Sequence, residues 1–149
     1  MTDAIVHIKV KRLREGSILP TRGSGLAAGY DLYACLDEPV QIAPGGVISV
    51  GTGLAMELPA GWFAAVFARS GLAMRQGLRP ANCVGVCDAD YRGEYIVPLY
   101  NDSAQVQVIS GGDRIAQMML LPCRTLEFEL TDALGDTPRG ESGFGSTGK

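Results

Sequence analysis

The chain has 149 residues, of which 46% are hydrophobic and 19% are charged, and its formal net charge is −3. This length and composition indicate one globular domain whose core is large enough to fold without disulfides. The negative charge argues against a protein that binds nucleic acid through bulk electrostatics, so any bound phosphate must meet individually placed arginines.

Short apolar runs recur about every 8–12 residues, and Gly, Pro, Asn or Asp separates most of them. In chain order, the runs predicted as strands are Ile5–Val10, Tyr30–Cys35, Val47–Val50, Leu54–Leu58, Trp62–Phe67, Tyr95–Tyr100, Gln105–Ile109, Ile115–Leu121 and Leu126–Leu130. This spacing favours an all-β fold, a jelly-roll-like β-sandwich or barrel. One short helix is predicted at about residues 71–76, with Ser70 as its N-cap and Gly77 as its stop.

The composition changes once, near Gly135. We therefore predict a jelly-roll domain over residues 1–134 and a flexible, Gly-rich C-terminal arm over residues 135–149. The stretch from Arg139 to Lys149 has too little apolar surface to fold alone, yet it carries glycines, hydroxyls and the single aromatic Phe144. The residues leave three alternatives open: a tail without a role, a phosphate-binding loop of the GxxxxGK type, and a mobile arm that closes over a ligand.

Other features exclude whole classes of site. The only histidine is His7, in a strand-like run, which argues against Ser-His-Asp or Cys-His nucleophilic chemistry. The four cysteines form no CxxC pair, and we expect them to be reduced and buried rather than zinc ligands. The sequence shows no signal peptide and no apolar run of about 18 residues, so we expect a cytoplasmic protein with neither a membrane nor a nucleic acid as partner.

Two segments carry the strongest candidate chemistry. The stretch from Ala68 to Gly71 combines an arginine, a hydroxyl and a glycine at a helix start, which suits either an anion site or an ordinary helix cap. In the segment from Gly85 to Glu94, Asp88 directly follows an apolar run, where a carboxylate can be oriented as a general base. The alternative for this second segment is a polar β-turn, with Tyr91 either in the core or stacked on a planar ligand.

Two further segments place polar groups in apolar strands. Asp31 lies inside one strand, and Arg114 and Gln117 lie at the start of another, beside Asp113. Each of these side chains is either an outward-facing solvated group or a ligand contact.

Together these segments resemble the motifs of the trimeric dUTP pyrophosphatase (dUTPase) family. The resemblance covers nearly the whole chain, in the family's order. Its motifs here are AGYDLYA (Ala28–Ala34), ARSGLA (Ala68–Ala73), GVCDADYRGEY (Gly85–Tyr95), GDRIAQ (Gly112–Gln117) and RGESGFGSTG (Arg139–Gly148). The chain departs from the family's common residues at Ala68, Cys87 and Ser142, where proline, isoleucine and glycine are usual.

The resemblance implies a homotrimer with shared active sites that hydrolyses dUTP to dUMP and pyrophosphate, with Mg²⁺ on the triphosphate. Such an enzyme limits uracil in DNA and supplies dUMP for thymidylate synthesis. In this sequence, Asp88 matches the base that activates the attacking water, and Asp31 matches a residue that reaches the metal through water. The positions that match substrate contacts are Arg69, Ser70, Gly71, Asn82, Tyr91, Gln117, Arg139, Phe144, Gly145, Ser146 and Thr147.

Those matches imply a separate role for each of three side chains at the nucleoside. Tyr91 packs under the deoxyribose, Asn82 reads uracil, and Phe144 stacks over the base. Ordering the arm costs about 1–2 kcal/mol per residue, so we expect closure only over the full triphosphate. Two alternatives remain at this stage: a dCTP deaminase-type sister enzyme, and a non-catalytic nucleotide-sensing regulator on the same fold.

Overall fold

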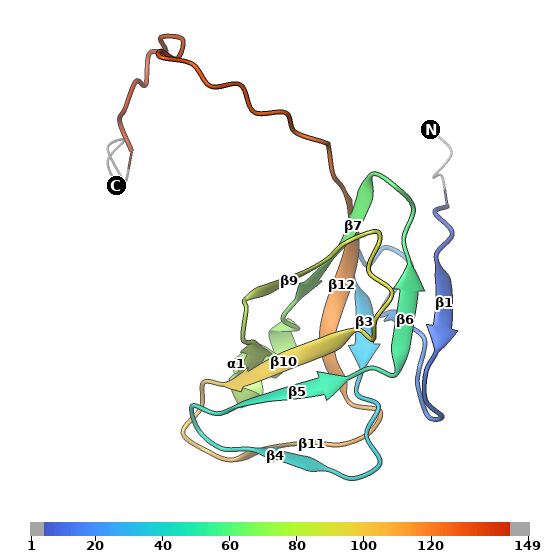
Figure 1. Ribbon diagram of the computed structural model, residues 1–149. Helices are drawn as coiled ribbons and strands as arrows, with labels where there is room; N and C mark the ends of the chain where they lie inside the picture. Colours follow the sequence, from blue (N-terminus) through green and yellow to red (C-terminus); the bar gives the residue numbers. More distant parts are fainter. Residues whose placement is uncertain (1–4, 144–149) are drawn as a thin grey trace.

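The computed structural model describes residues 5–143, which form twelve β-strands and one short helix (Figure 1). The elements are β1 (Lys9–Arg12), β2 (Thr21–Arg22), β3 (Tyr30–Tyr33), β4 (Val40–Ile42), β5 (Val47–Gly51), β6 (Leu54–Glu57), β7 (Trp62–Phe67), α1 (Ser70–Gln76), β8 (Leu78–Pro80), β9 (Val84–Cys87), β10 (Ile96–Asn101), β11 (Gln107–Ile109) and β12 (Arg114–Pro122). Within the described residues, no helix is long and apolar enough to cross a membrane.

The strands form antiparallel sheets whose neighbours are mostly distant in sequence. The largest sheet has the order β2-β3-β12-β7-β9, and a second has the order β5-β10-β8. Two further pairs, β1-β6 and β11-β4, complete the body. The late strand β12 inserts between β3 and β7, which is the long-range connectivity of a jelly roll rather than of a simple meander. The predicted all-β jelly-roll class is confirmed.

The sheets enclose one apolar core. Its fully buried side chains come from both larger sheets, for example Leu32 and Ile115 from one and Val50, Val97 and Leu99 from the other. Asn101 is a polar residue that is fully buried beside this core. The Asn101 amide donates to the carbonyls of Ile42 (2.8 Å) and Gln105 (2.7 Å), so its burial costs no unmade hydrogen bond.

The single helix begins one residue earlier than expected. Arg69 is the N-cap, in extended conformation, and Ser70 is already helical and makes no capping hydrogen bond, so the predicted Ser70 cap is wrong. The predicted stop is confirmed: Gly77 has φ of +65°, and its N–H bonds back to the carbonyl of Ala73.

Two predicted strands differ at the ends of the chain. The first ladder begins at Lys9 rather than Ile5, pairing with Glu57. The run Leu126–Leu130 is no strand: it belongs to an extended segment, residues 123–143, that leaves the body after β12 (Figure 1). Its apolar side chains Leu126, Phe128 and Leu130 are 68%, 89% and 101% exposed. The alternation is that of a strand, but none of the strands within residues 5–143 lies beside it.

Candidate functional site

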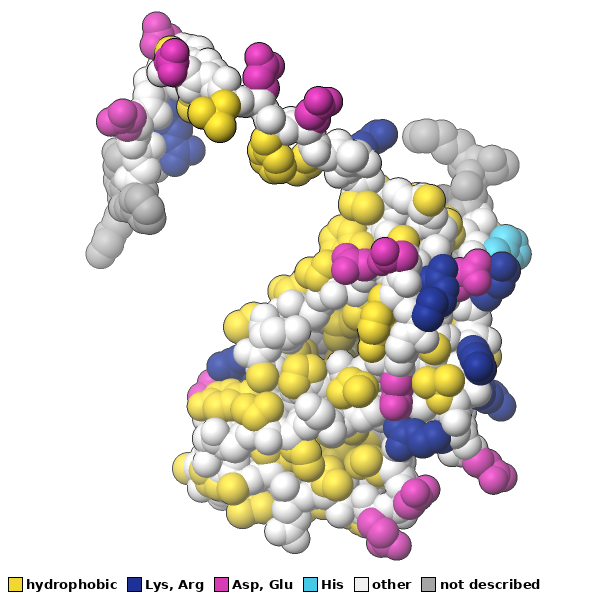
Figure 2. Space-filling view, viewed as in Figure 1, with side chains coloured by type: hydrophobic (Ala, Val, Ile, Leu, Met, Phe, Trp, Pro, Cys, Tyr) yellow, Lys and Arg dark blue, Asp and Glu magenta, His cyan; other side chains and the backbone are white. Residues whose placement is uncertain are grey.

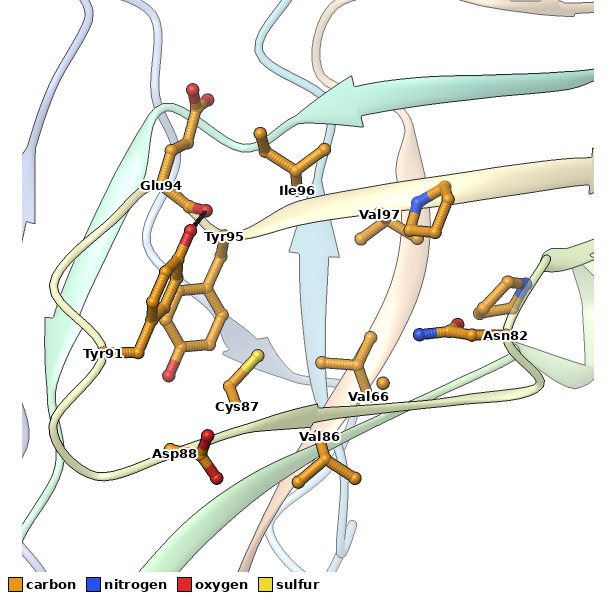
Figure 3. A pocket seen from close by; sticks show the side chains of 13 residues that line it. Val66, Asn82, Val86, Cys87, Asp88, Tyr91, Glu94, Tyr95, Ile96 and Val97 are labelled. Carbon is orange, nitrogen blue, oxygen red and sulfur yellow. Dashed lines mark hydrogen bonds between the residues drawn. The ribbon is translucent and has the colours of Figure 1, made fainter.

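A cavity of about 240 Å³ opens beside the end of β9, and we call it the hairpin pocket (Figure 3). Strand β9 brings Asp88 to its rim, and the turn that follows brings Tyr91. The lining residues that matter here are Asn82, Cys87, Asp88, Tyr91, Glu94 and Tyr95. A mixed polar and aromatic pocket of this kind suits a small, flat, hydrogen-bonding ligand.

Backbone hydrogen bonds fix the shape of the turn that carries Asp88. The Tyr91 N–H donates to the Asp88 carbonyl (3.2 Å), and the Tyr91 hydroxyl donates to the Glu94 carbonyl (3.0 Å). Gly93 makes this fold possible, because a Cβ there would lie 2.3 Å from the Tyr91 hydroxyl. The Glu94 carboxylate accepts from the Gly53 N–H (2.7 Å) and from Arg14, which ties the turn to the body.

The polar side chains at the rim of this pocket are available to hydrogen-bond to a ligand. Asp88 and Asn82 are exposed, and neither side chain hydrogen-bonds to another described residue. Two deeper groups stay neutral at physiological pH. Burial raises the pKa of the Cys87 thiol, helped by the charge of Asp88 and opposed by Tyr95, and burial together with Cys87 raises the pKa of the Tyr95 phenol.

A second cavity, of about 450 Å³, lies between β3, β12 and the start of α1, and we call it the charged cleft. Asp31 lies at its centre: the residue is 9% exposed, and its carboxylate accepts from Arg69 Nε (2.7 Å) and Arg114 Nη1 (3.4 Å). Ser70 and Gly71 are exposed at the adjoining helix start, and Gln117 lines the opposite wall. An arginine, a hydroxyl and free backbone N–H groups together suit an anionic ligand.

A β-bulge explains how one strand supplies two polar residues to this cleft. Arg114 and Gln117 are three positions apart, which would put them on opposite faces of a regular strand. The register of β12 against β3 shifts between Arg114 and Ala116, and the shift turns both polar side chains to one face. The Gln117 amide then donates to the Ala68 carbonyl (2.9 Å). The Gln117 side chain also packs closely on Gly29, where an added Cβ would lie 2.4 Å from Gln117 Oε1.

The two cavities lie at opposite ends of the β7-β9 ladder. They share no lining residue among the described ones. Cys87 pairs with Ala64, so Asp88 lies opposite Phe63, near the start of β7. Arg69 lies six residues after Phe63, beyond the other end of β7. At about 3.3 Å per residue, Asp88 and Arg69 of one chain are roughly 20 Å apart.

The structure thus brings the predicted site residues into two groups rather than one. Asn82, Asp88 and Tyr91 line the hairpin pocket, and Asp31, Arg69, Ser70, Gly71 and Gln117 line the charged cleft. Arg139 lies in the extended segment, exposed, and its Nε donates to the Ser142 carbonyl (2.8 Å). The predicted contacts Phe144, Gly145, Ser146 and Thr147 fall outside the described residues.

Sequence reasoning missed several supporting residues and misplaced two cysteines. The sequence places Tyr95 only in a strand, and Gly93 and Glu94 only in a polar turn. The glycine two residues after Tyr91 is the one signal that could have indicated close packing there. Cys83 and Cys123 are exposed rather than buried, although all four thiols are free. A larger cavity than either of these, about 680 Å³ between β1, β6 and β12, is mainly apolar and contains none of the predicted site residues.

Comparison with known proteins agrees with this geometry. The sequence model of the family described as dUTPase matches residues 15–148. The chain is 50% identical over 149 residues to the deoxyuridine 5′-triphosphate nucleotidohydrolase of Desulfitobacterium hafniense (strain DSM 10664 / DCB-2), covering 99% of both chains. It is 44% identical over 146 residues to the enzyme of the same name from Anaplasma marginale (strain St. Maries), covering 97% of this chain and 99% of that one.

Solved structures show the same likeness. A mutant dUTPase of Staphylococcus bacteriophage 80alpha with dUpNHpp superposes with a TM-score of 0.87 at 25% identity, covering 96% of this chain and 99% of that one. A mutant dUTPase from phage phi11 of S. aureus, described with a structural Mg(II) ion, has a TM-score of 0.79 at 22% identity and covers 87% of this chain and 99% of that one. By its family match and by relatives that span almost its whole length, this chain belongs to the dUTPase family.

Proposed function

We propose that this dUTP diphosphatase cleaves dUTP to dUMP and pyrophosphate by attack of an Asp88-activated water on the α-phosphorus. The observation that carries the proposal is the pairing of an uncommitted carboxylate at a nucleoside-sized pocket with a separate arginine-lined cleft. Phosphoryl transfer needs positioning, charge neutralisation and a base that orients water, and it needs no nucleophilic side chain. A chain with one exposed histidine meets that requirement.

The hairpin pocket is proposed to hold the nucleoside. Tyr91 presents its ring under the deoxyribose and leaves no room for a 2′-hydroxyl, which discriminates against UTP. Asn82 and the backbone of β9 offer donors and acceptors to the uracil edge. A site that leaves its own polar groups unpaired with the wrong base rejects that base strongly.

The charged cleft is proposed to hold the phosphates. The Arg69 guanidinium, the Ser70 hydroxyl, the Gly71 backbone and the Gln117 amide are the available donors. Before substrate binds, Asp31 forms an ion pair with both Arg69 and Arg114 and keeps both in place, which leaves a net charge of +1 for a phosphate. When substrate binds, phosphate oxygens accept some of the hydrogen bonds that the arginines donated to Asp31, and the arginines need not move far.

Magnesium fits this cleft only in an outer role. Among residues 5–143, no group of three His, Cys, Asp or Glu side chains gathers as a metal site, and both oxygens of Asp31 already face arginines. Mg²⁺ prefers phosphate oxygens and its own waters. Asp31 would therefore hold it through water, where the ion supplies charge neutralisation for the triphosphate.

We further propose a homotrimer in which neighbouring chains complete each site. Asp88 and Arg69 of one chain are too far apart to act on one α-phosphorus, so the pocket of one copy must face the cleft of another. The pocket rim supports this arrangement, because the apolar Val84, Val86 and Ile96 around it are 42%, 63% and 52% exposed. Figure 2 shows such apolar side chains across one face of the body.

The segment after β12 is proposed to reach a neighbouring copy. Its twenty-one residues, 123–143, can span up to about 70 Å when extended. Its exposed alternating apolar residues need a partner strand, and its far end carries Arg139 toward the residues that match the closing arm. We propose that Arg139, Phe144, Gly145, Ser146 and Thr147 cover a substrate bound between other copies.

The decisive experiment measures pyrophosphate release from dUTP and, in separate reactions, from UTP, dTTP and dCTP. We expect turnover of dUTP alone, and turnover of all four would overturn the nucleoside assignment. Ammonia release from dCTP would indicate the deaminase chemistry instead. Binding without pyrophosphate release would indicate a nucleotide-sensing protein.

The proposed arm has its own test. Deletion of residues 139–149 should leave the fold and the trimer intact and remove most turnover, because closure over the triphosphate is lost. Sedimentation measures assembly while the pyrophosphate assay measures turnover. Full kcat in the shortened chain would show that the arm takes no part in the reaction.

A further inference from the structure

Glu94 lines the hairpin pocket, but the proposed reaction gives its carboxylate no contact with substrate. The Glu94 carbonyl accepts from the Tyr91 hydroxyl (3.0 Å). In Figure 3 this bond joins the two residues, while the Glu94 carboxylate points to the other side, away from the Tyr91 ring and from Asp88. The carboxylate therefore serves something other than direct binding of the nucleoside.

Two donors from the body of the protein hold the Glu94 carboxylate. The Gly53 N–H donates to Oε1 (2.7 Å), and the Arg14 guanidinium donates to the same oxygen. The Glu94 side chain is 24% exposed and that of Arg14 is 44% exposed. Gly53 is buried, so loss of the carboxylate would take the acceptor of a backbone N–H that lies away from water.

Arg14, Gly53 and Glu94 form one connected unit, which we call the Glu94 clamp. Leu13, the residue before Arg14, donates its N–H to the Gly53 carbonyl (2.8 Å). Gly53 thus bonds to the N-terminal segment through its carbonyl and to Glu94 through its N–H. The ion pair lies over Gly51, where an added Cβ would meet both the carboxylate and the guanidinium. The clamp therefore fixes Glu94 against the turn between β5 and β6.

The clamp acts on Tyr91 through the main chain of Glu94. On the far side of Glu94, the Tyr95 N–H donates to the Leu54 carbonyl (2.8 Å), so the chain is held there as well. The Tyr91 residue itself is 43% exposed, and its ring lies beside that of Tyr95, with centroids 6.2 Å apart. The hydroxyl end of this half-exposed ring is held by its bond to the Glu94 carbonyl. Whatever fixes that carbonyl also fixes the ring.

We propose that Glu94 is a positioning residue that sets the discrimination between dUTP and UTP. Its clamped carboxylate fixes the carbonyl that holds the Tyr91 hydroxyl, and so keeps the ring where it leaves no room for a 2′-hydroxyl. The inference rests on the proposed role of Tyr91 in the nucleoside pocket. Selectivity for the sugar then depends on an ion pair with Arg14 that touches no part of the substrate.

The test measures the ratio of kcat/KM for dUTP to kcat/KM for UTP in the variant Glu94→Ala. We expect this ratio to fall about three- to tenfold, because a less firmly held Tyr91 ring admits the 2′-hydroxyl more often. Both substrates are measured on one preparation, so the fraction of folded enzyme cancels, and a loss of stability alone does not change the ratio. An unchanged ratio would overturn the proposal.

Two further variants remove the ion pair alone. Glu94→Gln keeps an oxygen for the Gly53 N–H but loses the charge that faces Arg14, and Arg14→Ala removes the partner cation. Each should lower the ratio about two- to threefold, less than Glu94→Ala. If Glu94→Ala does not fold, a wild-type ratio in both of these variants overturns the proposal.

Glu57→Ala is the matched control. Glu57 pairs with Lys9 of the N-terminal strand β1 (2.9 Å), as Glu94 pairs with Arg14, but it lines neither the hairpin pocket nor the charged cleft. Its ratio should equal that of wild type. A fall as large as that of Glu94→Ala would show that loss of any such ion pair relaxes the pocket, and the specific role of Glu94 would be lost.

A double-mutant cycle with Tyr91→Phe tests the link to the ring. Phenylalanine keeps the ring but lacks the hydroxyl that bonds to the Glu94 carbonyl, so Glu94→Ala should lower the ratio little further once Tyr91→Phe is present. Effects that multiply would overturn the hydroxyl as the link. The unaltered protein tests the proposed function separately: if it cleaves UTP as readily as dUTP, the role of Tyr91 fails before any variant is measured.

Discussion

The hairpin pocket and the charged cleft are held in shape by different forces. In the cleft, Asp31 is the shared acceptor of two arginines, so the ligand-binding groups stabilise one another before a ligand arrives. In the pocket, backbone bonds of the turn and packed rings fix the frame, while the Asp88 side chain meets no described partner. This difference in what holds each site predicts which residues can be changed without loss of stability. Changes at Asp88 should affect catalysis alone, and changes at Asp31 should affect catalysis and stability together.

The largest effect is expected from Asp88→Asn in the pocket. Loss of the base should lower kcat by about 10²- to 10⁴-fold, because the amide cannot accept the proton of the attacking water. The thermal midpoint should stay at the wild-type value, since no described hydrogen bond depends on the carboxylate. Pyrophosphate release and scanning calorimetry measure the two quantities. A rate within about threefold of wild type would remove Asp88 as the base.

The same exchange in the cleft should give a different pattern. Asp31→Asn leaves Arg69 and Arg114 without their anionic acceptor, and we expect the free energy of unfolding to fall by about 1–3 kcal/mol together with turnover. Glu57→Gln is the matched control, because it removes a carboxylate whose ion pair with Lys9 is exposed and contributes little. Urea unfolding separates the two variants. Equal stability in both would show that the cleft is not held by Asp31.

This contrast also explains which features the sequence could predict. The turn glycines, the Trp62–Phe67 run and the helix stop at Gly77 act locally, and each was found from its own residues. The joint placement of Arg114 and Gln117 depends on a bulge whose register is set by β3, a partner some eighty residues away in sequence. The Leu126–Leu130 alternation was recognised, but an alternating segment becomes a strand only beside a partner, and no described strand lies next to it.

In the pocket too, the sequence predicts the residues that carry a local signal and not the contacts between distant segments. Asp88 was identified because it directly follows an apolar run, which is a local signal. Tyr95 and Cys87 line the same pocket from segments that belong to two different sheets, and no spacing within the chain predicts that they meet there. The separation of Asp88 from Arg69 likewise appears only once the β7-β9 register is known.

A third prediction tests whether backbone geometry, rather than charge, sets the pocket. Gly93→Ala places a Cβ 2.3 Å from the Tyr91 hydroxyl and must displace that ring. We expect discrimination between dUTP and UTP to fall about tenfold, since the surface that excludes the 2′-hydroxyl moves. Gly25→Ala is the control, because no atom lies within 4 Å of the added carbon. The ratio of kcat/KM for the two substrates is the readout, and unchanged discrimination would mean that Tyr91 does not set it.

The smallest effect concerns the neutral groups beneath the pocket and appears only in alkali. The folded protein holds the protons of Cys87 and Tyr95 above their ordinary pKa values of 9.0 and 10.0, because burial disfavours both anions. The unfolded chain releases these protons at the ordinary values and so binds fewer of them. Stability is therefore complete below about pH 9 and falls as pH rises, by up to about 1.4 kcal/mol per pH unit for each group.

Tyr95→Phe removes the phenol from this balance. The variant should match or slightly exceed wild-type stability near neutral pH, where its buried hydroxyl was unpaired, and its stability should fall less steeply than that of wild type above about pH 10. Urea unfolding from about pH 8 to about pH 11 measures both slopes. Parallel slopes would mean that the Tyr95 phenol ionises as freely in the folded protein as in the unfolded chain. The Tyr95 hydroxyl would then be hydrated in the folded protein rather than buried.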